Sequence, residues 1–270
     1  MKNMIRAMMA VSALAGALAL NAQNPQPAPT PSPSPTPAPQ AAAAPEAAPA
    51  AALTADEIVA KHLDALGGKQ AIGQVKSITM DTDVQVMGND APGNTVILDG
   101  VGAKSETDFN GSKIIQCYTN KGGWMVNPMA GMSDPTPMPD AQYKAGKEDI
   151  YVGGALYDYA ERGAKVELVS KDADTYTIKL TPKDGEPTTY VIDAKTYLIK
   201  SETRKAQMQG QDVDMTTSYS DYRKTDTGFL MPYSMDVDFG GQFQLTISVK
   251  KLELNKTVDP SIFEMPKAGS

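Results

Sequence analysis

The sequence predicts an α+β fold built on one curled antiparallel sheet of about ten or eleven strands, forming a half-open β-barrel with a few helices as a lid or plug. Short runs of β-branched and aromatic residues, separated by turn residues, recur from Lys76 onward. Residues 188–204 are the clearest case, because apolar runs at 190–192 and 197–199 flank a turn led by Asp193. No parallel crossover is indicated, and a sheet this wide must curl.

Residues 1–22 are predicted to be a secretory signal peptide. Lys2 and Arg6 precede an apolar run at 8–20, and Ala22 offers a small residue for cleavage. This run is shorter than the roughly twenty residues that span a bilayer, so we expect cleavage and no transmembrane segment in the mature chain. No cysteine lies at the end of this run, where a lipoprotein would be acylated, so no lipid anchor is expected. The predicted location is the periplasm.

Residues 23–53 are predicted to be a Pro/Ala-rich disordered linker, which leaves 54–270 as the folded domain. Half of the 20 prolines lie between Pro25 and Pro49. Such a segment has almost nothing to bury and favours an extended polyproline II spacer. Recognition of its PxxP pattern by a partner is the alternative.

The charge balance narrows the range of partners. The chain has 25 basic and 32 acidic residues, a net charge of −7, and loss of the signal peptide with Lys2 and Arg6 makes it more negative. An acidic domain without basic clusters disfavours nucleic acid and anionic membrane surfaces. Cys117 is the only cysteine, so no intramolecular disulfide forms, and we expect a small buried hydrophobe on a strand.

The domain opens with a helix. Thr54 is predicted to be its N-cap, with Glu57 completing a capping box, and Gly67 and Gly68 end it. A second helical turn at 69–75 leads into the first strand. His62, the only histidine, lies on this first helix, where we expect a solvated surface residue rather than a base or a ligand.

Two strands show the clearest alternation of apolar and polar residues. In 77–86 the residues Ile78, Met80, Thr82, Val84 and Val86 are predicted to share one face. In 242–254 the residues Phe243, Leu245, Ile247 and Val249 do the same. Both strands should therefore be half-buried.

The middle of the domain differs. Residues 127–140 hold four prolines and three methionines, which predicts an irregular loop rather than sheet. Residues 141–162 are predicted to form one or two helical pieces broken at Gly153 and Gly154. Together they suggest a cover over one face of the sheet. A mobile cover and a firmly packed excursion both remain open.

Little in the sequence predicts catalysis, and we expect no enzyme, no metal and no cofactor. One histidine and one cysteine make a poor metal-ligand set, and no phosphate-binding glycine loop or nucleophile elbow is present. Acidic residues two apart on strands, such as Asp236 and Asp238, usually mark the solvated face. A hydrolase would need two acids from unrelated strands to converge in a cleft.

Apolar binding is better supported. Eleven of the 15 methionines follow the signal peptide, and four cluster at 125–138. Flexible, polarizable thioethers can repack around variable apolar partners, although they also serve as core filler. We predict that an apolar cavity, with its mouth near Trp124, is lined by Met80, Val84, Trp124, Met125, Met129, Met132, Met215 and Met235.

The domain resembles the LolA/LolB superfamily of periplasmic lipoprotein carriers, in particular the LolA-like outer membrane lipoprotein-sorting proteins. The resemblance covers about 54–265 and is carried by the segments 63–71, 75–78, 122–128, 192–200, 219–224, 228–232 and 254–263. It implies a half-open barrel around an apolar cavity that holds acyl chains of a lipoprotein or lipid, with helices as a lid. Donor and acceptor proteins at the inner and outer membranes are the partners it implies.

The sequence therefore predicts a periplasmic, non-catalytic carrier or binder of lipoprotein acyl chains or other lipid-like apolar cargo. The alternative is a protein-interaction or stress-sensing module on the same fold without a carried lipid. The superfamily contains both kinds of protein, so membership alone does not fix the cargo.

Overall fold

The computed structural model describes residues 53–86, 88–208 and 211–267. The predicted signal peptide at 1–22 and almost all of the predicted linker at 23–53 lie outside the described residues. From Thr54 onward the described residues belong to one compact unit. None of the helices in these ranges has both the length and the hydrophobicity of a membrane span.

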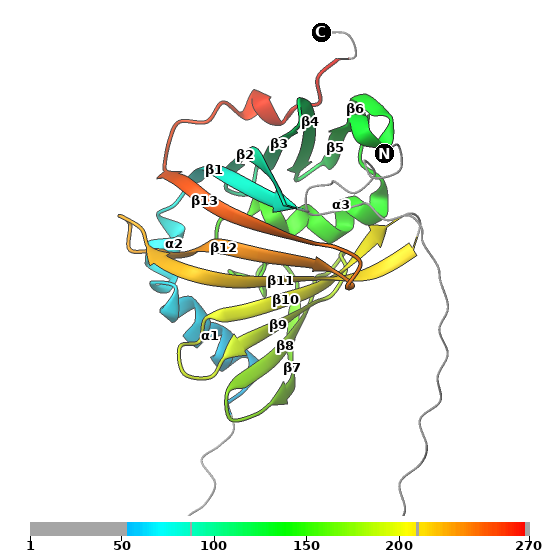
Figure 1. The fold of residues 1–270 in the computed structure, drawn as a ribbon. Helices are drawn as coiled ribbons and strands as arrows, with labels where there is room; N and C mark the ends of the chain where they lie inside the picture. The colour runs from blue at the N-terminus through cyan, green and yellow to red at the C-terminus, as the bar shows by residue number, and fades with distance from the viewer. Residues whose placement is uncertain (1–52, 87, 209–210, 268–270) are drawn as a thin grey trace, which may run out of the picture. The chain divides into compact units, whose positions relative to one another are not determined.

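A curled antiparallel sheet of 13 strands dominates the domain (Figure 1). The strands are β1 (Ser77–Val86), β2 (Asn89–Leu98), β3 (Gly102–Phe109), β4 (Ser112–Thr119), β5 (Gly122–Asn127), β6 (Met132–Pro137), β7 (Lys165–Lys171), β8 (Thr175–Thr181), β9 (Thr188–Asp193), β10 (Ile199–Met208), β11 (Gln211–Lys224), β12 (Leu230–Phe239) and β13 (Gln244–Leu254). The helices are α1 (Ala55–Ala65), α2 (Gly68–Gly73) and α3 (Asp140–Gly146), with 3-10 turns η1 (Pro128–Ala130), η2 (Lys147–Ile150) and η3 (Pro260–Phe263). The predicted fold class is confirmed, with more strands than the ten or eleven expected.

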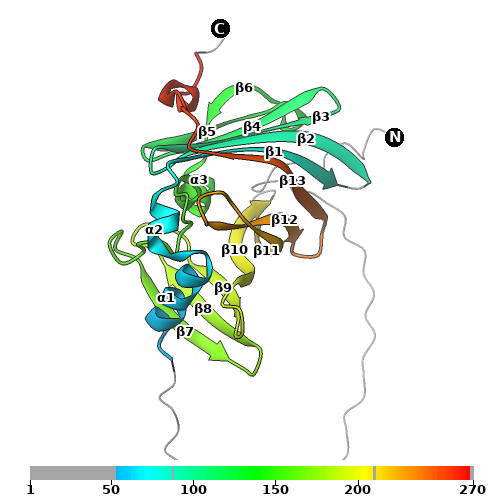
Figure 2. The same cartoon turned by 90° about the vertical axis from the view of Figure 1, so that its left-hand side faces the viewer.

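The order of the strands explains why the concave face is covered. The sheet runs β6-β5-β4-β3-β2-β1-β13-β12-β11-β10-β9-β8-β7, so β6 and β7, which follow one another along the chain, form its two opposite edges. The segment between them, residues 138–164, must cross from one edge to the other. Figure 2 shows α3 lying inside the curl between the two arms of the sheet. We call residues 138–164 the covering segment.

The covering segment is less helical than the sequence predicted. It forms α3 and η2, and from Tyr151 it continues in turns. Gly154 has φ +72, a left-handed conformation that ends any helical continuation. Ile150 and Leu156 are each 2 % exposed, so the segment packs on the sheet through apolar side chains. Whether it moves stays an open prediction.

The strand β6 was predicted as an irregular loop, and this prediction is wrong. Residues Trp124 to Asn127 of β5 pair with β6, with one irregularity between Met125 and Asn127. An edge strand tolerates proline, because one side of its backbone needs no hydrogen-bond partner in the sheet. Pro135 and Pro137 are therefore compatible with β6 at the edge of the sheet.

The first helix follows its sequence signals. The Glu57 amide donates to Thr54 Oγ1 at 3.2 Å, and the Thr54 amide donates to Glu57 Oε2 at 2.8 Å, so the predicted capping box is confirmed. Gly67, with φ +113, ends α1, and a Cβ there would lie 2.5 Å from the Gly228 carbonyl oxygen. Only glycine fits this close approach, which sets α1 against the chain that leads into β12.

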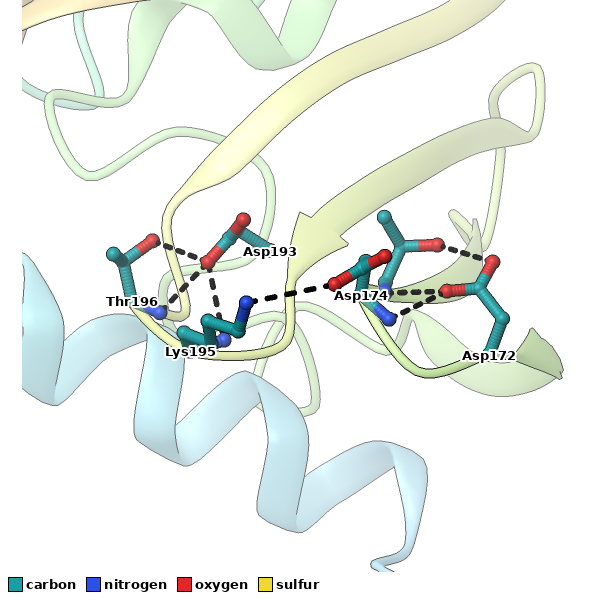
Figure 3. A network of polar contacts seen from close by, with 6 residues as sticks. Asp172, Asp174, Asp193, Lys195 and Thr196 are labelled. Carbon is teal, nitrogen blue, oxygen red and sulfur yellow. Dashed lines mark hydrogen bonds and ion pairs between the residues drawn. The ribbon is translucent and has the colours of Figure 1, made fainter.

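The hairpin between β9 and β10 is fixed by Asp193, as the sequence predicted. Its carboxylate accepts from the amides of Lys195 and Thr196 at 3.0 and 2.8 Å (Figure 3). Asp172 fixes the neighbouring β7–β8 turn in the same way, through the Asp174 amide at 2.8 Å. The Ala194 amide donates to the Asp174 carbonyl at 2.9 Å, so the two turns are joined.

The core lies on the concave face, and the predicted alternation in β1 and β13 is confirmed. Val84, Val86, Leu245 and Val249 are each 9 % exposed or less, and the first three pack in one cluster with Phe239. A smaller cluster lies on the convex face, where η3 covers part of the sheet. It contains Cys117, Trp124, Val126 and Phe263.

Candidate functional site

A cavity of about 410 Å³ lies on the concave face beneath the covering segment. One wall comes from apolar side chains of β1–β4, β12 and β13. They include Met80, Ile97, Ala103, Tyr118, Met235 and Ile247. Tyr151, Val152 and Leu156 of the covering segment and Leu66 next to α1 close other sides. The volume falls within the about 300–1,000 Å³ that is usual for small-molecule sites.

The adjoining part of the wall is polar and comes from β9, β10 and β11, where Tyr219 pairs in register with Met235 of the apolar part. Glu202 pairs in register with Tyr190 on β9 and with Thr217 on β11, and all three line the cavity. Arg204 and Tyr219 also line it, two residues along from Glu202 and from Thr217 respectively. Side chains two apart on a strand share a face, so these five residues form one patch. We call them the polar row.

Arg204 joins the polar row to the covering segment. Its Nη1 donates to the Ala145 carbonyl at 3.0 Å and to Asp149 Oδ1 at 3.2 Å. Its side chain is 10 % exposed, whereas that of Asp149 is 45 % exposed. Burial alone would lower the pKa of Arg204, but Asp149 and Glu202 raise it, so the guanidinium stays charged. The Nε atom is buried and has no hydrogen-bond partner among the described residues.

Glu202 faces the same guanidinium from the same strand. Burial raises the pKa of its carboxyl, and Arg204 and Tyr219 offset part of that rise. Asp149 and Glu202 therefore both lie near the Arg204 guanidinium although they come from unrelated elements, which is the arrangement that the hydrolase alternative required. Because one guanidinium interacts with both acids, the arrangement balances charge and gives no sign of activating a water.

His62 is the one prediction on α1 that is wrong. It is 3 % exposed, its Nδ1 lies 2.8 Å from the Tyr197 carbonyl, and it lines the cavity. A carbonyl only accepts, so Nδ1 carries the proton and donates it. Ile58 and Leu66, four residues before and after His62, are also buried. This spacing places His62 on the inward face of the helix.

The burial of His62 predicts a pH dependence of stability. Burial lowers the pKa of His62 below its ordinary 6.5. The folded state therefore binds this proton less readily than the unfolded chain, so the contribution of His62 is complete above pH 6.5 and is lost as the pH falls from there toward the folded pKa. We expect the free energy of unfolding, measured by urea denaturation, to fall in this window.

The matched control is His62→Asn, which keeps a donor near the Tyr197 carbonyl and does not titrate. The raised pKa of Glu202 acts in the opposite sense, because its contribution is lost as the pH rises from about 4.5. The difference between wild type and His62→Asn isolates His62. Identical pH profiles for the two proteins would contradict the prediction.

The structure brings two of the eight predicted cavity residues to the cavity, Met80 and Met235. Met125 is 2 % exposed and packs with Ala103 and Tyr118, which do line it, and Met132 packs against the same cluster. Met125 and Met132 are therefore next to the lining without being part of it, and the remaining four lie farther from the cavity. Of these, Val84 and Met215 are buried in the core cluster of the central strands, Met129 packs against that cluster, and Trp124 lies elsewhere.

Trp124 is on the convex face and not at a cavity mouth. It is 4 % exposed, packs with Cys117 and Phe263, and donates from Nε1 to the Phe263 carbonyl at 2.9 Å. Its neighbour Met125 packs on the concave side, as the alternation of a strand requires. Trp124 therefore fixes η3 to the outside of the sheet.

The described residues hold no group of three or more His, Cys, Asp or Glu side chains that could bind a metal ion. Cys117 is 0 % exposed, and burial raises the pKa of its thiol to about 12. A thiol in that state is not a nucleophile at neutral pH. The buried hydrophobe expected at this position is confirmed.

Several cavity residues were not predicted from the sequence. Glu202 and Arg204 lie in 201–205, a run of Ser, Glu, Thr, Arg and Lys with no apolar residue to reveal which face is inward. Residues two apart and both charged usually indicate a solvated face. No other feature of the sequence indicated that these two side chains face the cavity.

No protein-family model matches the chain. No curated protein matches it in sequence. Solved structures do match in fold. A LolA superfamily protein from Nitrosomonas europaea is 12 % identical, with a TM-score of 0.53 over 79 % of this chain and 98 % of that chain.

Two further structures agree with that match. A domain from Vibrio parahaemolyticus, described as an outer membrane lipoprotein-sorting protein, is 11 % identical, with a TM-score of 0.51 over 77 % of this chain and 95 % of that one. A DUF1329 family protein from Desulfovibrio piger is 14 % identical, with a TM-score of 0.52 over 78 % and 97 %. Identities this low report on the fold alone. With its curled, unclosed sheet, this chain has a LolA-like fold.

Proposed function

We propose that the cavity on the concave face binds the acyl chain of a lipoprotein, or another lipid-like apolar cargo, without covalent chemistry. The observation that carries this proposal is the cavity of about 410 Å³ with its apolar wall, which includes Met80, Met235 and Ile247. Each methylene group transferred from water to such a surface contributes about 0.8 kcal/mol. One chain therefore gives substantial affinity without any catalytic group.

The proposed setting is the periplasm. It rests on the signal peptide predicted at 1–22, with the Pro/Ala-rich segment 23–53 as a spacer that lets the domain at 54–270 reach its partners. The similar structures include a LolA superfamily protein and a lipoprotein-sorting domain, which suggests lipoproteins as the source of the acyl chain. Membrane proteins that deliver and accept this cargo complete the proposal.

The first test is native mass spectrometry of the full chain purified from a periplasmic extract, followed by lipid analysis of the denatured sample. We expect one co-purifying acylated species per protein. A protein that is bare on purification, and that stays bare after incubation with lipids and lipopeptides, would contradict the proposal and favour the interaction or sensing module.

Variants that fill the cavity give an independent test. Met80→Trp and Met235→Trp add bulk to the apolar wall, and we expect each to weaken binding of a fluorescent acyl probe by about tenfold, ~1.4 kcal/mol. The matched control is Met265→Trp, because Met265 is 47 % exposed and does not line the cavity. Equal affinity in all three variants would place the binding site elsewhere.

A further inference from the structure

Part of the cavity wall is apolar, and the polar row supplies groups that can form hydrogen bonds. Binding of hydrocarbon alone does not account for the polar row. A cavity meant only for hydrocarbon gains nothing from a buried carboxyl and a buried guanidinium, because each is costly to remove from water. Glu202 and Arg204 nevertheless line this cavity, beside the apolar part of its wall that includes Met80 and Ile247. Their position fits the polar end of a ligand whose chain lies against the apolar wall.

The charges in the cavity wall argue against an anionic end. Four carboxylates and three basic side chains line it. Of the basic groups, Lys104 pairs with Glu106 at 2.8 Å and has its ammonium over the Trp124 ring on the convex face, and Arg204 pairs with Asp149 and faces Glu202. Lys144 is exposed to solvent, where an ion pair contributes little. A carboxylate placed here would be the third acid around one guanidinium.

A neutral acceptor fits better. The Arg204 guanidinium lines the cavity with a side chain that is 10 % exposed, and it bonds to the Ala145 carbonyl and to Asp149 through Nη1 and Nη2. A guanidinium has five N–H groups, so donors remain for a ligand. An ester or amide carbonyl oxygen would accept a hydrogen bond from one of them and bring no charge. Burial also raises the pKa of the Glu202 carboxyl, so this site disfavours a negative charge even before a ligand binds.

The volume of the cavity limits the number of acyl chains that it can hold. At about 410 Å³ the cavity is near the lower end of the usual range for small-molecule sites, which suits one hydrocarbon chain rather than several side by side.

We infer that the cavity selects a single acyl chain attached through a neutral ester or amide linkage, whose carbonyl oxygen accepts from the Arg204 guanidinium, and that it rejects the same chain as a free carboxylate. The inference rests on the proposed function, because it names the linkage of the bound chain. Acylated glycerol and the acylated amino terminus of a lipoprotein share this chemistry.

The test compares three probes of equal chain length on the wild-type protein by isothermal titration calorimetry at neutral pH. They are monopalmitoylglycerol (an ester), an N-palmitoylated peptide amide (an amide), and palmitate. We expect palmitate to bind at least about tenfold more weakly than the ester or the amide, since like charges a few ångströms apart repel strongly in a partly buried site. Tighter binding of the amide than of the ester would identify an N-acylated peptide as the preferred ligand, and the reverse an acyl glycerol ester.

Two variants assign the selectivity to its residues. Glu202→Gln removes one negative charge with little change of shape, and we expect it to strengthen palmitate binding about tenfold and leave the ester unchanged. Arg204→Lys keeps the positive charge but loses the planar guanidinium with its five donors, and we expect it to weaken the ester and the amide by about fivefold. Lys205→Gln, on the opposite face of the same strand, is the matched control and should change nothing.

The outcomes separate this inference from the function it rests on. Palmitate and ester binding equally well to the wild-type protein would overturn the selectivity and leave an acyl-binding cavity in place. Failure of all three probes to bind would instead remove the proposed function. Unchanged selectivity in Glu202→Gln would show that the polar row does not determine the linkage.

Discussion

Replacing Trp124 by alanine is expected to lower the free energy of unfolding by about 3–5 kcal/mol. The indole is 4 % exposed, packs against Cys117 and Phe263, and holds the Phe263 carbonyl with its Nε1–H at 2.9 Å. The variant therefore leaves a large cavity under η3 and releases that segment from the sheet. Urea denaturation followed by circular dichroism is the measurement, because Trp124 is the only tryptophan and its fluorescence is lost.

The control for this prediction is Trp124→Phe, which keeps an aromatic ring and loses only the hydrogen bond. Its expected cost is about 1 kcal/mol. Because Trp124 lies on the convex face, Trp124→Phe should also leave the affinity for acyl probes unchanged. If Trp124→Ala lost less free energy of unfolding than Trp124→Phe, η3 would not depend on this contact.

Replacing Arg204 by alanine is expected to cost about 2–3 kcal/mol and to loosen the covering segment. The change removes the hydrogen bonds to the Ala145 carbonyl and Asp149, and it leaves Glu202 without its counter-charge. The value lies below that of a fully buried pair because Asp149 is 45 % exposed. Urea denaturation measures the cost, and faster amide hydrogen exchange in residues 140–156 reports the loosening.

Lys205→Ala is the matched control, since Lys205 follows Arg204 on the same strand but faces outward. Its ion pair with Asp214, at 2.7 Å, joins side chains that are 55 % and 61 % exposed. Solvent screens such a pair, so no measurable loss is expected. Equal losses of stability in Arg204→Ala and Lys205→Ala would show that the contacts of Arg204 with the covering segment stabilise the fold no more than an exposed ion pair does.

Much of the sheet was predictable because its two faces differ in polarity. In β1 and β13 one face is buried and the other is solvated, so the period of two in the sequence predicts both the strand and which of its side chains face the core. Asp193 and the capping box of Thr54 and Glu57 act locally, through hydrogen bonds that span only a few residues. Such features need no knowledge of the rest of the chain.

The cavity was predicted less well because its residues depend on contacts between distant elements. Trp124, Met125 and Val126 are all buried, since η3 covers the convex face at this point. A strand buried on both faces gives no alternation to show which side chains point inward. The polar row was not predicted, for the opposite reason. Glu202 and Arg204 are charged residues of the kind found on a solvated strand, and the segment that covers Arg204 is distant in sequence.

His62 illustrates a signal that was present and outweighed. Its spacing of four from Ile58 and from Leu66 placed it on the buried face of α1, whereas the charged neighbours Lys61 and Asp64 suggested solvent. Periodicity was the better guide, because a helix turns adjacent residues toward different surroundings.

The pairing of β1 with β13 has a consequence for how the chain folds. Ile78 lies opposite Leu254, so the centre of the sheet joins residues from the two ends of the domain, while every other strand pairs with its neighbour in sequence. The runs β1–β6 and β7–β13 are local meanders that can form independently. The β1–β13 pairing must instead close a loop of nearly the whole domain, at an entropy cost that grows with the logarithm of loop length. We therefore expect docking of the two meanders along this line to be the slow step of folding, as high contact order implies.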